Sequence, residues 1–290
     1  KHGHPRRLYS VAATCITHGT HYIDLSDARD YVAHITNLDA QAKANKVSVI
    51  SGASTVPGLS SAVLAHYKDH FKQIDSLVYG ITPGQKTERG LATTRAILSY
   101  LGKPLKPANG SKKIDYGWQQ IYRQHYPELG QRWMASCDIP DLDLFPHKYG
   151  IKHIQFSAGM ESSPLHLGMW VASWCIRLKL PINLIRYAPC LLKFSHWFDR
   201  FGTANGGMHM IIKGMGHDNR PKTIAWYLIA NQGHGPQIPI TPAVILAQKM
   251  RTGCPKSWIG AQACVGLVTL EDYLSALSEL DIKTYVTGAS

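Results

Sequence analysis

Apolar positions in the first 72 residues alternate between short β-branched runs and longer stretches with helical spacing. We predict strands over residues 21–25 and 47–51. Between and around them we predict helices over residues 8–18, 30–45 and 56–71. The regular alternation of strand and helix predicts a parallel α/β sheet in this part of the chain.

The pattern changes after residue 72, where strands occur in pairs and turns become longer. We predict strands over 74–81, 151–157, 208–213, 223–230 and 282–286, and helices over 87–101, 165–180, 182–198, 242–252 and 270–280. Residues 102–150 are rich in Pro, Gly and aromatic side chains and indicate short strands and loops. The strands over 208–213 and 223–230 flank a Gly-Asn-Pro-containing turn and are expected to pair antiparallel. The second region is therefore predicted to be α+β with a mixed or antiparallel sheet.

Composition narrows the class of protein. The chain has 290 residues, 44% of them hydrophobic, and carries a formal net charge of +12. That charge suits an anionic ligand or surface, but no RNA-binding or zinc-finger motif and no Lys/Arg-rich run supports nucleic acid. The six cysteines form no CxxC pair, which favours reduced thiols in a cytoplasmic protein. The longest uncharged apolar stretch, 162–176, is shorter than the roughly 20 residues that span a bilayer.

The chain contains no GxGxxG turn between a strand and a helix, the arrangement that holds a dinucleotide pyrophosphate. The glycine runs at 202–207 and 214–216 lack the flanking strand and helix and are interpreted as turns. We therefore expect the α/β alternation to begin in the middle of a fold, with the earlier part not represented before Lys1.

Several short segments together carry a family resemblance. The two most specific are HYIDLSD at 21–27 and SGASTVPGLS at 51–60. Further segments are GITPG at 80–84, RGLAT at 89–93, YGW at 116–118, CDIPD at 137–141 and GHGPQIP at 233–239. With these, the chain resembles the saccharopine dehydrogenase-like oxidoreductase family, in particular its bacterial members.

The resemblance implies an NAD(P)-binding Rossmann domain followed by a mixed α/β domain that carries the substrate. It places residues 1–72 in the last part of the Rossmann sheet and residues 73–290 in the substrate or dimerisation domain, whose last helices pack back on the first segment. It implies NAD or NADP as the cofactor, with weak or no binding expected for this segment alone, and a homo-oligomer. The substrate is left open between a small molecule and a lipid-like one.

Candidate functional residues follow the predicted strand ends, where ligands of open α/β sheets bind. Asp24 is the candidate catalytic carboxylate and Asp27 a candidate substrate contact, with helix capping as the alternative role. The tight turn formed by Gly52, Ser54, Pro57 and Gly58 is expected to offer free backbone N–H groups to the cofactor. The two turns near residues 24 and 52 are expected to lie side by side.

Two further candidates lie in the second region. His234, flanked by Gly233 and Gly235, is a candidate catalytic group in a loop that permits close approach of a ligand, although a lone His in such a loop is more often simply hydrogen-bonded. Arg89 is a candidate for holding a substrate carboxylate. The acidic group Asp138, Asp141 and Asp143 is interpreted as a capped loop, and we predict no metal site. No GxSxG or SxxK motif suggests a covalent nucleophile.

Residues 164–200 combine an apolar helical face with basic side chains. Leu167, Trp170, Val171, Trp174 and Leu178 recur at helical spacing, and Arg177, Lys179, Arg186, Lys193 and Arg200 interrupt the stretch. Three interpretations stay open: packing on the domain's own sheet, a subunit interface, or contact with a membrane surface. Membrane contact predicts a peripheral location at the inner membrane face and suits a lipid-like substrate.

The sequence therefore supports two alternative functions. The first is a saccharopine dehydrogenase-like oxidoreductase that uses NAD(P) and lacks its phosphate-binding loop. The second is a non-catalytic binding or membrane-associated interaction module derived from the same fold.

Overall fold

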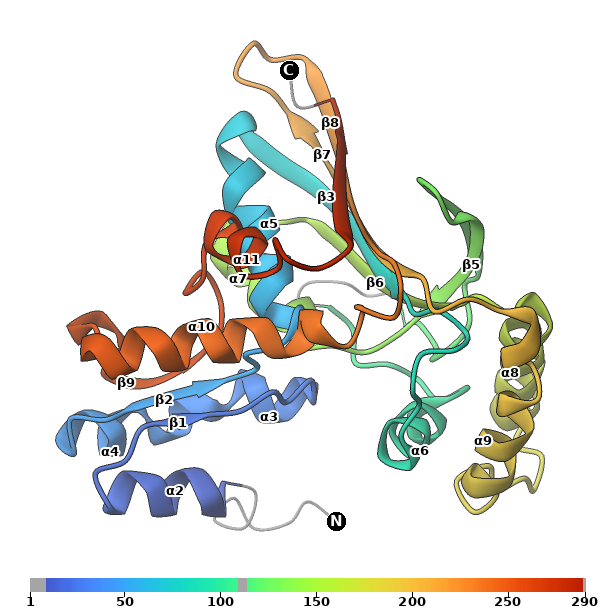
Figure 1. Cartoon of the computed structure of the whole chain (residues 1–290), viewed down its shortest axis with the longest axis horizontal. Helices are drawn as coiled ribbons and strands as arrows, with labels where there is room; N and C mark the ends of the chain where they lie inside the picture. The colour runs from blue at the N-terminus through green and yellow to red at the C-terminus, as the bar shows by residue number, and fades with distance from the viewer. Residues whose placement is uncertain (1–8, 109–113, 289–290) are drawn as a thin grey trace. The chain divides into compact units, whose positions relative to one another are not determined.

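The computed structural model describes residues 9–108 and 114–288. The chain divides into two compact units (Figure 1). Within the described residues, unit 1 consists of 9–69, 139–148 and 237–279, and unit 2 of 70–138, 149–236 and 280–288. Each unit contains segments that are far apart in the sequence.

Unit 1 is built on a three-stranded parallel sheet in the order β1-β2-β9. Its elements are α2 (Ser10–Thr17), β1 (Tyr22–Ile23), α3 (Arg29–Ala33), η1 (Ile35–Leu38), α4 (Asp39–Ala44), β2 (Ser48–Ser51), η2 (Thr55–Leu59), α5 (Ser60–Tyr67), η3 (Lys68–His70), α7 (Asp141–Tyr149), α10 (Gln237–Gly253), η5 (Lys256–Trp258), β9 (Gly260–Ala263) and α11 (Leu270–Ala276). In Figure 1, α2 and α4 lie on one side of the strands and α10 on the other. The predicted parallel α/β arrangement is confirmed.

The core of unit 1 follows the apolar pattern of the sequence. Helix α2 buries Ala12 and Ile16, which belong to one cluster with Ile35, with Val47 just before β2 and with Val49 in β2. These side chains are almost completely removed from water, which is the main favourable contribution to folding. Each fully buried Ile or Val contributes roughly 1.5–3 kcal/mol relative to an exposed one.

Unit 2 contains a seven-stranded sheet in the order β10-β8-β7-β3-β6-β5-β4. Its elements are β3 (Gln73–Thr82), α6 (Leu91–Tyr100), β4 (Tyr122–Tyr126), β5 (Gly130–Ser136), β6 (His153–Met160), α8 (Ser163–Arg177), α9 (Ala188–His196), η4 (Asp199–Phe201), β7 (Gly206–Met215), β8 (Pro221–Ala230) and β10 (Ile282–Thr287). Only the β3–β6 pair is parallel, with Val78 opposite Gln155. The expected mixed sheet, including the β7–β8 hairpin, is therefore confirmed.

Several predicted elements differ from the observed ones. The helix expected over 30–45 is broken into α3, η1 and α4, because His34 leaves the helical conformation. The expected helix over 87–101 begins only at Leu91. Helix α10 begins at Gln237, five residues before the predicted start, and includes Pro242. Helix α7, in a region expected to be loops, and strand β9 were not predicted.

Candidate functional site

A carboxylate lies at the carboxyl end of β1 in unit 1. Asp24 follows the strand directly, and its Oδ1 accepts three hydrogen bonds: from the backbone N–H of Ser26 at 2.9 Å, the hydroxyl of Ser51 at 2.9 Å and the backbone N–H of Gly52 at 3.0 Å. The backbone N–H of Ala53 also donates to the carbonyl oxygen of Asp24 at 2.8 Å. The two predicted turns therefore lie side by side, joined by one carboxylate oxygen.

The second oxygen of Asp24 has a different environment. Asp24 Oδ2 is buried and has no hydrogen-bond partner among the described residues. A buried carboxylate oxygen without a donor is costly and is therefore uncommon in folded proteins. Within the described residues, Oδ2 is therefore an acceptor that a ligand can use, beside the Tyr22 hydroxyl, which also interacts with this carboxylate.

Tyrosine side chains surround the carboxylate. The hydroxyl groups of Tyr22 and Tyr31 lie 3.3 Å apart, and the Tyr9 hydroxyl donates to the carbonyl oxygen of Tyr31 at 2.8 Å. Burial, the hydrogen bond with Tyr31, the charge of Asp24 and a hydrogen bond with Asp24 all raise the pKa of Tyr22. Burial is also the largest cause that raises the pKa of Tyr9, to about 12. At neutral pH these phenols are therefore protonated donors and not bases.

The turn predicted to contact the cofactor is closed by the protein itself. Gly52, Ser54, Pro57 and Gly58 are all buried. The N–H of Gly52 donates to Asp24 and that of Ser54 to the carbonyl oxygen of Gly52. A Cβ at Gly52 would lie 2.8 Å from Pro57, and one at Gly58 would lie 3.1 Å from Pro242. The expectation of free N–H groups at Gly52 and Ser54 is wrong, because short-range hydrogen bonds within the two turns already use them.

The neighbouring carboxylates have other partners. Asp27 is exposed, and no described contact orients it toward Asp24. Asp141 accepts a 2.5 Å hydrogen bond from the Ser60 hydroxyl, and Asp143 pairs with the buried Arg29 at 2.6 Å. These two carboxylates lie in the first turn of α7 and attach it to α5 and α3, so this part of the acidic group forms a helix and not the expected capped loop. A substrate contact by Asp27 stays a prediction.

His234 belongs to a hydrogen-bonded loop of unit 2. Its Nδ1 accepts the backbone N–H of Asp281 at 2.9 Å, and its own backbone N–H donates to Asn231. Gly233 has φ of +80°, a conformation that glycine adopts without strain, and Gly235 faces open space. The loop is therefore fixed to the start of β10 through the imidazole, which leaves Nε2 as the only ring nitrogen for any catalytic role. That role stays a prediction.

Arg89 precedes α6 in unit 2 and is engaged by the protein. Its guanidinium pairs with Asp199 at 2.5 Å, approaches His196 Nδ1 at 3.1 Å and also donates to the Gln85 carbonyl oxygen. Burial alone would raise the pKa of Asp199, but the hydrogen bonds from Arg89, His196 and Gln85 hold it below the usual value. Arg89 thus has a carboxylate partner already, and binding of a substrate carboxylate would have to compete with Asp199.

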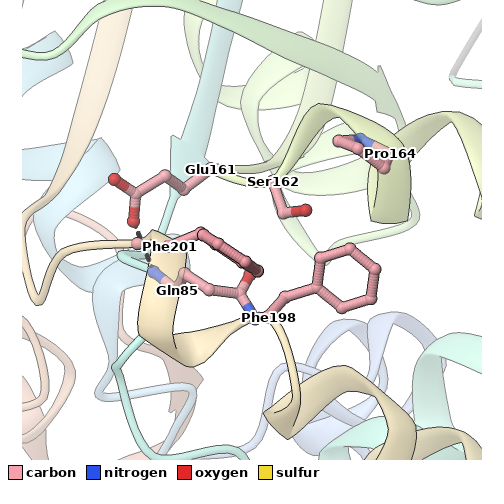
Figure 2. Close-up of a pocket in the computed structure, with 7 residues that line it drawn as sticks. Gln85, Glu161, Ser162, Pro164, Phe198 and Phe201 are labelled. Carbon is pink, nitrogen blue, oxygen red and sulfur yellow. Dashed lines mark hydrogen bonds between the residues drawn. The ribbon is translucent and has the colours of Figure 1, made fainter.

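A pocket of about 360 Å³ lies beside this ion pair, within unit 2 (Figure 2). Its volume lies within the usual range for small-molecule sites. It is lined by Gln85, Glu161, Ser162, Pro164, Phe198, Phe201 and Gly202. Figure 2 shows Phe198 and Phe201 facing the turn that carries Glu161 and Ser162. The walls therefore combine two aromatic rings with a small number of polar groups.

Glu161 fixes the loops around the pocket. Its carboxylate accepts hydrogen bonds from the N–H of Gln85 at 2.7 Å and from the N–H and hydroxyl of Thr203, both at 2.9 Å. It also pairs with Arg132 at 3.3 Å. Glu161 is therefore saturated and positions the pocket walls. Ser162 precedes α8 but makes no capping hydrogen bond with its hydroxyl, so this hydroxyl is the polar group best placed to bind a ligand.

Sequence reasoning did not find this pocket. Its residues come from positions 85, 161–164 and 198–202, and they meet only because β3, β6 and η4 end at the same side of unit 2. The sequence feature nearest to the pocket is the RGLAT segment at 89–93, in which Arg89 was predicted to hold a substrate carboxylate. That residue supports the pocket through Gln85 and Asp199 but is not one of its walls.

Metal and thiol chemistry have little support in the described parts of the chain. No group of three or more His, Cys, Asp or Glu side chains is arranged there to hold a metal. Burial raises the pKa of Cys137 to about 11, and burial with the charge of Asp24 raises the pKa of Cys264 to about 12. Both side chains are therefore neutral thiols near pH 7, a poor state for a nucleophile.

The fold belongs to the class in which a Rossmann-like parallel sheet is combined with a second, mixed-sheet domain. A solved structure with this fold is apo histidine-tagged saccharopine dehydrogenase (L-Glu forming) from Saccharomyces cerevisiae. The two align with a TM-score of 0.55 and 12% sequence identity, over 95% of this chain and 82% of that chain. No family model and no curated protein matches the chain. The likeness shows the fold expected from the sequence resemblance.

Proposed function

We propose that this chain is an NAD(P)-dependent oxidoreductase that acts on a small, largely apolar molecule. The observation that carries the proposal is the saccharopine dehydrogenase fold over 95% of the chain. The pocket lined by Phe198 and Phe201 in unit 2 offers mostly apolar walls to such a substrate, and the Asp24 turn of unit 1 offers a carboxylate oxygen to a polar group of the cofactor. The bound nicotinamide would supply or accept the hydride, and the protein would supply position and electrostatics.

Asp24 is the residue of unit 1 that fits a bound polar group. Its Oδ1 is saturated, which fixes the carboxylate, whereas its buried Oδ2 accepts no hydrogen bond from the residues that the structure describes. We assign Oδ2 as the acceptor for an amide or amine hydrogen of the cofactor or substrate. The closed turn at Gly52–Gly58 fits a cofactor cradle poorly, so its role is to hold Asp24 in place. The chain contains no GxGxxG turn, so we expect the pyrophosphate to add little to its affinity for NAD(P).

The test is a fluorescence titration of NADPH with the wild-type chain and with Asp24→Asn and Asp27→Asn. Asn keeps one oxygen that can accept the three structural hydrogen bonds and replaces the outer oxygen by a donor. We expect weak binding by the wild type, about tenfold weaker binding by Asp24→Asn, and no change for the exposed control Asp27→Asn. Equal binding by all three proteins would remove Asp24 from the site.

One observation favours the second function, a non-catalytic module derived from this fold. The turn that the resemblance places against the cofactor is buried, and its first N–H groups are used internally. A protein of this kind would bind a ligand in the unit 2 pocket without binding NADPH. The titration separates the two functions, because the module is expected to give no NADPH signal at any concentration.

A further inference from the structure

Helix α8 is inverted with respect to the usual amphipathic pattern. The side chains that it buries are the polar His166 and Ser173, both completely removed from solvent. On the opposite side, Val171 is 54% exposed and Leu178, just after the helix, 69% exposed. A surface helix of a globular protein normally turns its apolar stripe toward the core. Packing on the protein's own sheet therefore does not explain the apolar stripe of α8.

Large hydrophobic side chains are also exposed in the connection between α8 and α9, in α9 and up to Phe201. Ten of the sixteen large hydrophobic side chains that are exposed in the described residues lie between positions 171 and 201. This apolar surface consists of Val171, Trp174, Leu178, Leu180, Ile182, Ile185, Tyr187, Phe194, Trp197 and Phe201. Single exposed hydrophobic residues need no explanation, but a concentration of this kind marks an interaction site.

The charges of this segment all point to a negatively charged partner. No Asp or Glu occurs from position 162 to 198, whereas Arg177, Lys179, Arg186 and Lys193 lie in that range and are exposed. The next carboxylate, Asp199, is already paired with Arg89. Arg200 lies over the Trp197 ring at 4.2 Å, whereas Arg177 lies over the rings of Tyr116 at 3.9 Å and Trp174 at 4.9 Å and also donates to Gln119 at 2.6 Å. The cations therefore lie within the apolar surface.

These charges argue against a second copy of this chain as the partner that covers the apolar surface. A twofold symmetric dimer brings the same surface of both copies together. The cations of one copy would then face those of the other without any carboxylate from residues 162–198 to compensate them, and like charges across an interface are costly. Tryptophan and tyrosine beside Lys and Arg are typical of helices that lie at the surface of a lipid bilayer.

We infer that the apolar surface of the α8–α9 segment docks onto an anionic phospholipid bilayer. No helix in residues 9–108 or 114–288 is long and apolar enough to cross a membrane. The segment thus lies in the headgroup region, with Trp174, Trp197 and Phe194 among the acyl chains and the cations at the phosphates. The inference does not depend on the proposed oxidoreductase activity.

The experiment is flotation of the full chain with vesicles of pure phosphatidylcholine and of phosphatidylcholine mixed with phosphatidylserine. Two double variants change the surface: Lys179→Glu with Lys193→Glu, and Trp174→Ser with Trp197→Ser. Two matched controls make the same kinds of change on exposed positions of unit 1: Arg251→Glu with Lys256→Glu, and Ile240→Ser with Val244→Ser. Circular dichroism and thermal unfolding establish that all variants are folded.

We expect binding to the anionic vesicles that weakens with added salt and falls at least about tenfold in both surface variants, with both controls unchanged. Trp fluorescence should shift to the blue on binding in the wild type. The inference is overturned by absence of binding to anionic vesicles, by equal binding to neutral ones, or by controls that lose as much as the surface variants. It is also overturned if sedimentation shows a dimer that the Trp variant dissociates.

Discussion

The turn around Asp24 in unit 1 and helix α8 in unit 2 arrange polar groups in opposite ways. At the turn, Asp24 Oδ1 accepts hydrogen bonds from Ser26, Ser51 and Gly52, whereas Oδ2 has no partner in the part of the chain that the structure describes. In α8, the polar His166 is buried, and neither ring nitrogen has a partner among residues 9–108 and 114–288, whereas Val171 and Trp174 are exposed. At the turn, Asp24 Oδ2 is left as an acceptor for a hydrogen bond from a ligand. The arrangement at α8 leaves Val171, Trp174 and Leu178 of the apolar stripe exposed, and covering them requires a partner surface much larger than a small molecule.

The largest effect that tests this comparison is acid unfolding. Burial lowers the pKa of His166 to about 4 and that of His209 to about 3, below the unfolded value of 6.5. Both are neutral in the two states above pH 6.5. As the pH falls below 6.5, only the unfolded chain takes up these protons, so stability is lost down to about pH 4 for His166 and pH 3 for His209.

The expected loss is about 1.4 kcal/mol per pH unit for each histidine, measured by urea unfolding between pH 7 and 4.5. His166→Leu should remove one of these two contributions, and it leaves no hydrogen bond unmade because His166 has none. Substitution of the exposed His18 serves as the control. An unchanged pH slope in His166→Leu would show that this imidazole is not held neutral inside the protein.

The next effect concerns the two oxygens of Asp24. Asp24→Ala should destabilise the protein by about 2–4 kcal/mol, because the buried Ser51 hydroxyl and Gly52 N–H lose their acceptor. Asp24→Asn should cost less than about 1 kcal/mol, since an amide oxygen still accepts these bonds. Chemical denaturation measures both. If the two variants lose stability equally, Oδ1 and Oδ2 do not have the separate roles assigned to them.

Two substitutions test whether α8 buries its polar side and exposes apolar residues. Ser173 is fully buried, its hydroxyl donates to the Trp170 carbonyl oxygen at 2.6 Å, and the backbone of Gly102 packs against its carbonyl oxygen. Ser173→Leu should therefore cost about 1–3 kcal/mol through overpacking. Leu178→Ser should change stability by less than about 0.5 kcal/mol, because that side chain is largely in water. The opposite ranking in thermal unfolding would mean that α8 faces the core with its apolar side.

The smallest expected effect concerns Arg89, whose ion pair with Asp199 holds the loops beside the pocket. Arg89→Ala removes the ion pair with Asp199 and should cost about 1–2 kcal/mol, since the pair is only partly exposed. Without this anchor, η4 and its neighbour Phe198 should become more mobile. Hydrogen exchange of residues 198–203, compared with Arg95→Ala in the neighbouring helix α6, measures this. Protection that stays equal in both variants would remove Arg89 from the pocket architecture.

The sequence predicted what short-range patterns determine. The β-branched run of β2 and the β7–β8 hairpin follow from local spacing, and the proximity of Asp24 to Gly52 follows from the parallel pairing of β1 with β2. Strand β9 was missed because Gly260 and Ala261 have low strand propensity, and it exists through its pairing with β2. Helix α7 was missed because Pro146 lies inside it.

The exposed face of α8, the pocket and the partner of Arg89 depend on contacts between residues that are far apart in the sequence, and local patterns do not predict such contacts. The stripe of α8 was correctly placed on one helical face, but periodicity alone does not say which face meets solvent. In the same way, Gln85, Glu161 and Phe198 meet in a pocket only after the sheet of unit 2 has formed. Arg89 was expected to bind substrate, and its engagement by Asp199 became visible only in the fold.

Saturation-transfer NMR with NADPH tests the proposed function most directly, because it reports which end of the cofactor touches the protein. We predict transfer to the nicotinamide protons and little to the adenine protons in the wild type and in Asp27→Asn, with strong loss of the nicotinamide signal in Asp24→Asn. Absence of nicotinamide transfer in the wild type, or equal transfer in Asp24→Asn, would contradict the assignment of Asp24 Oδ2 to the ligand.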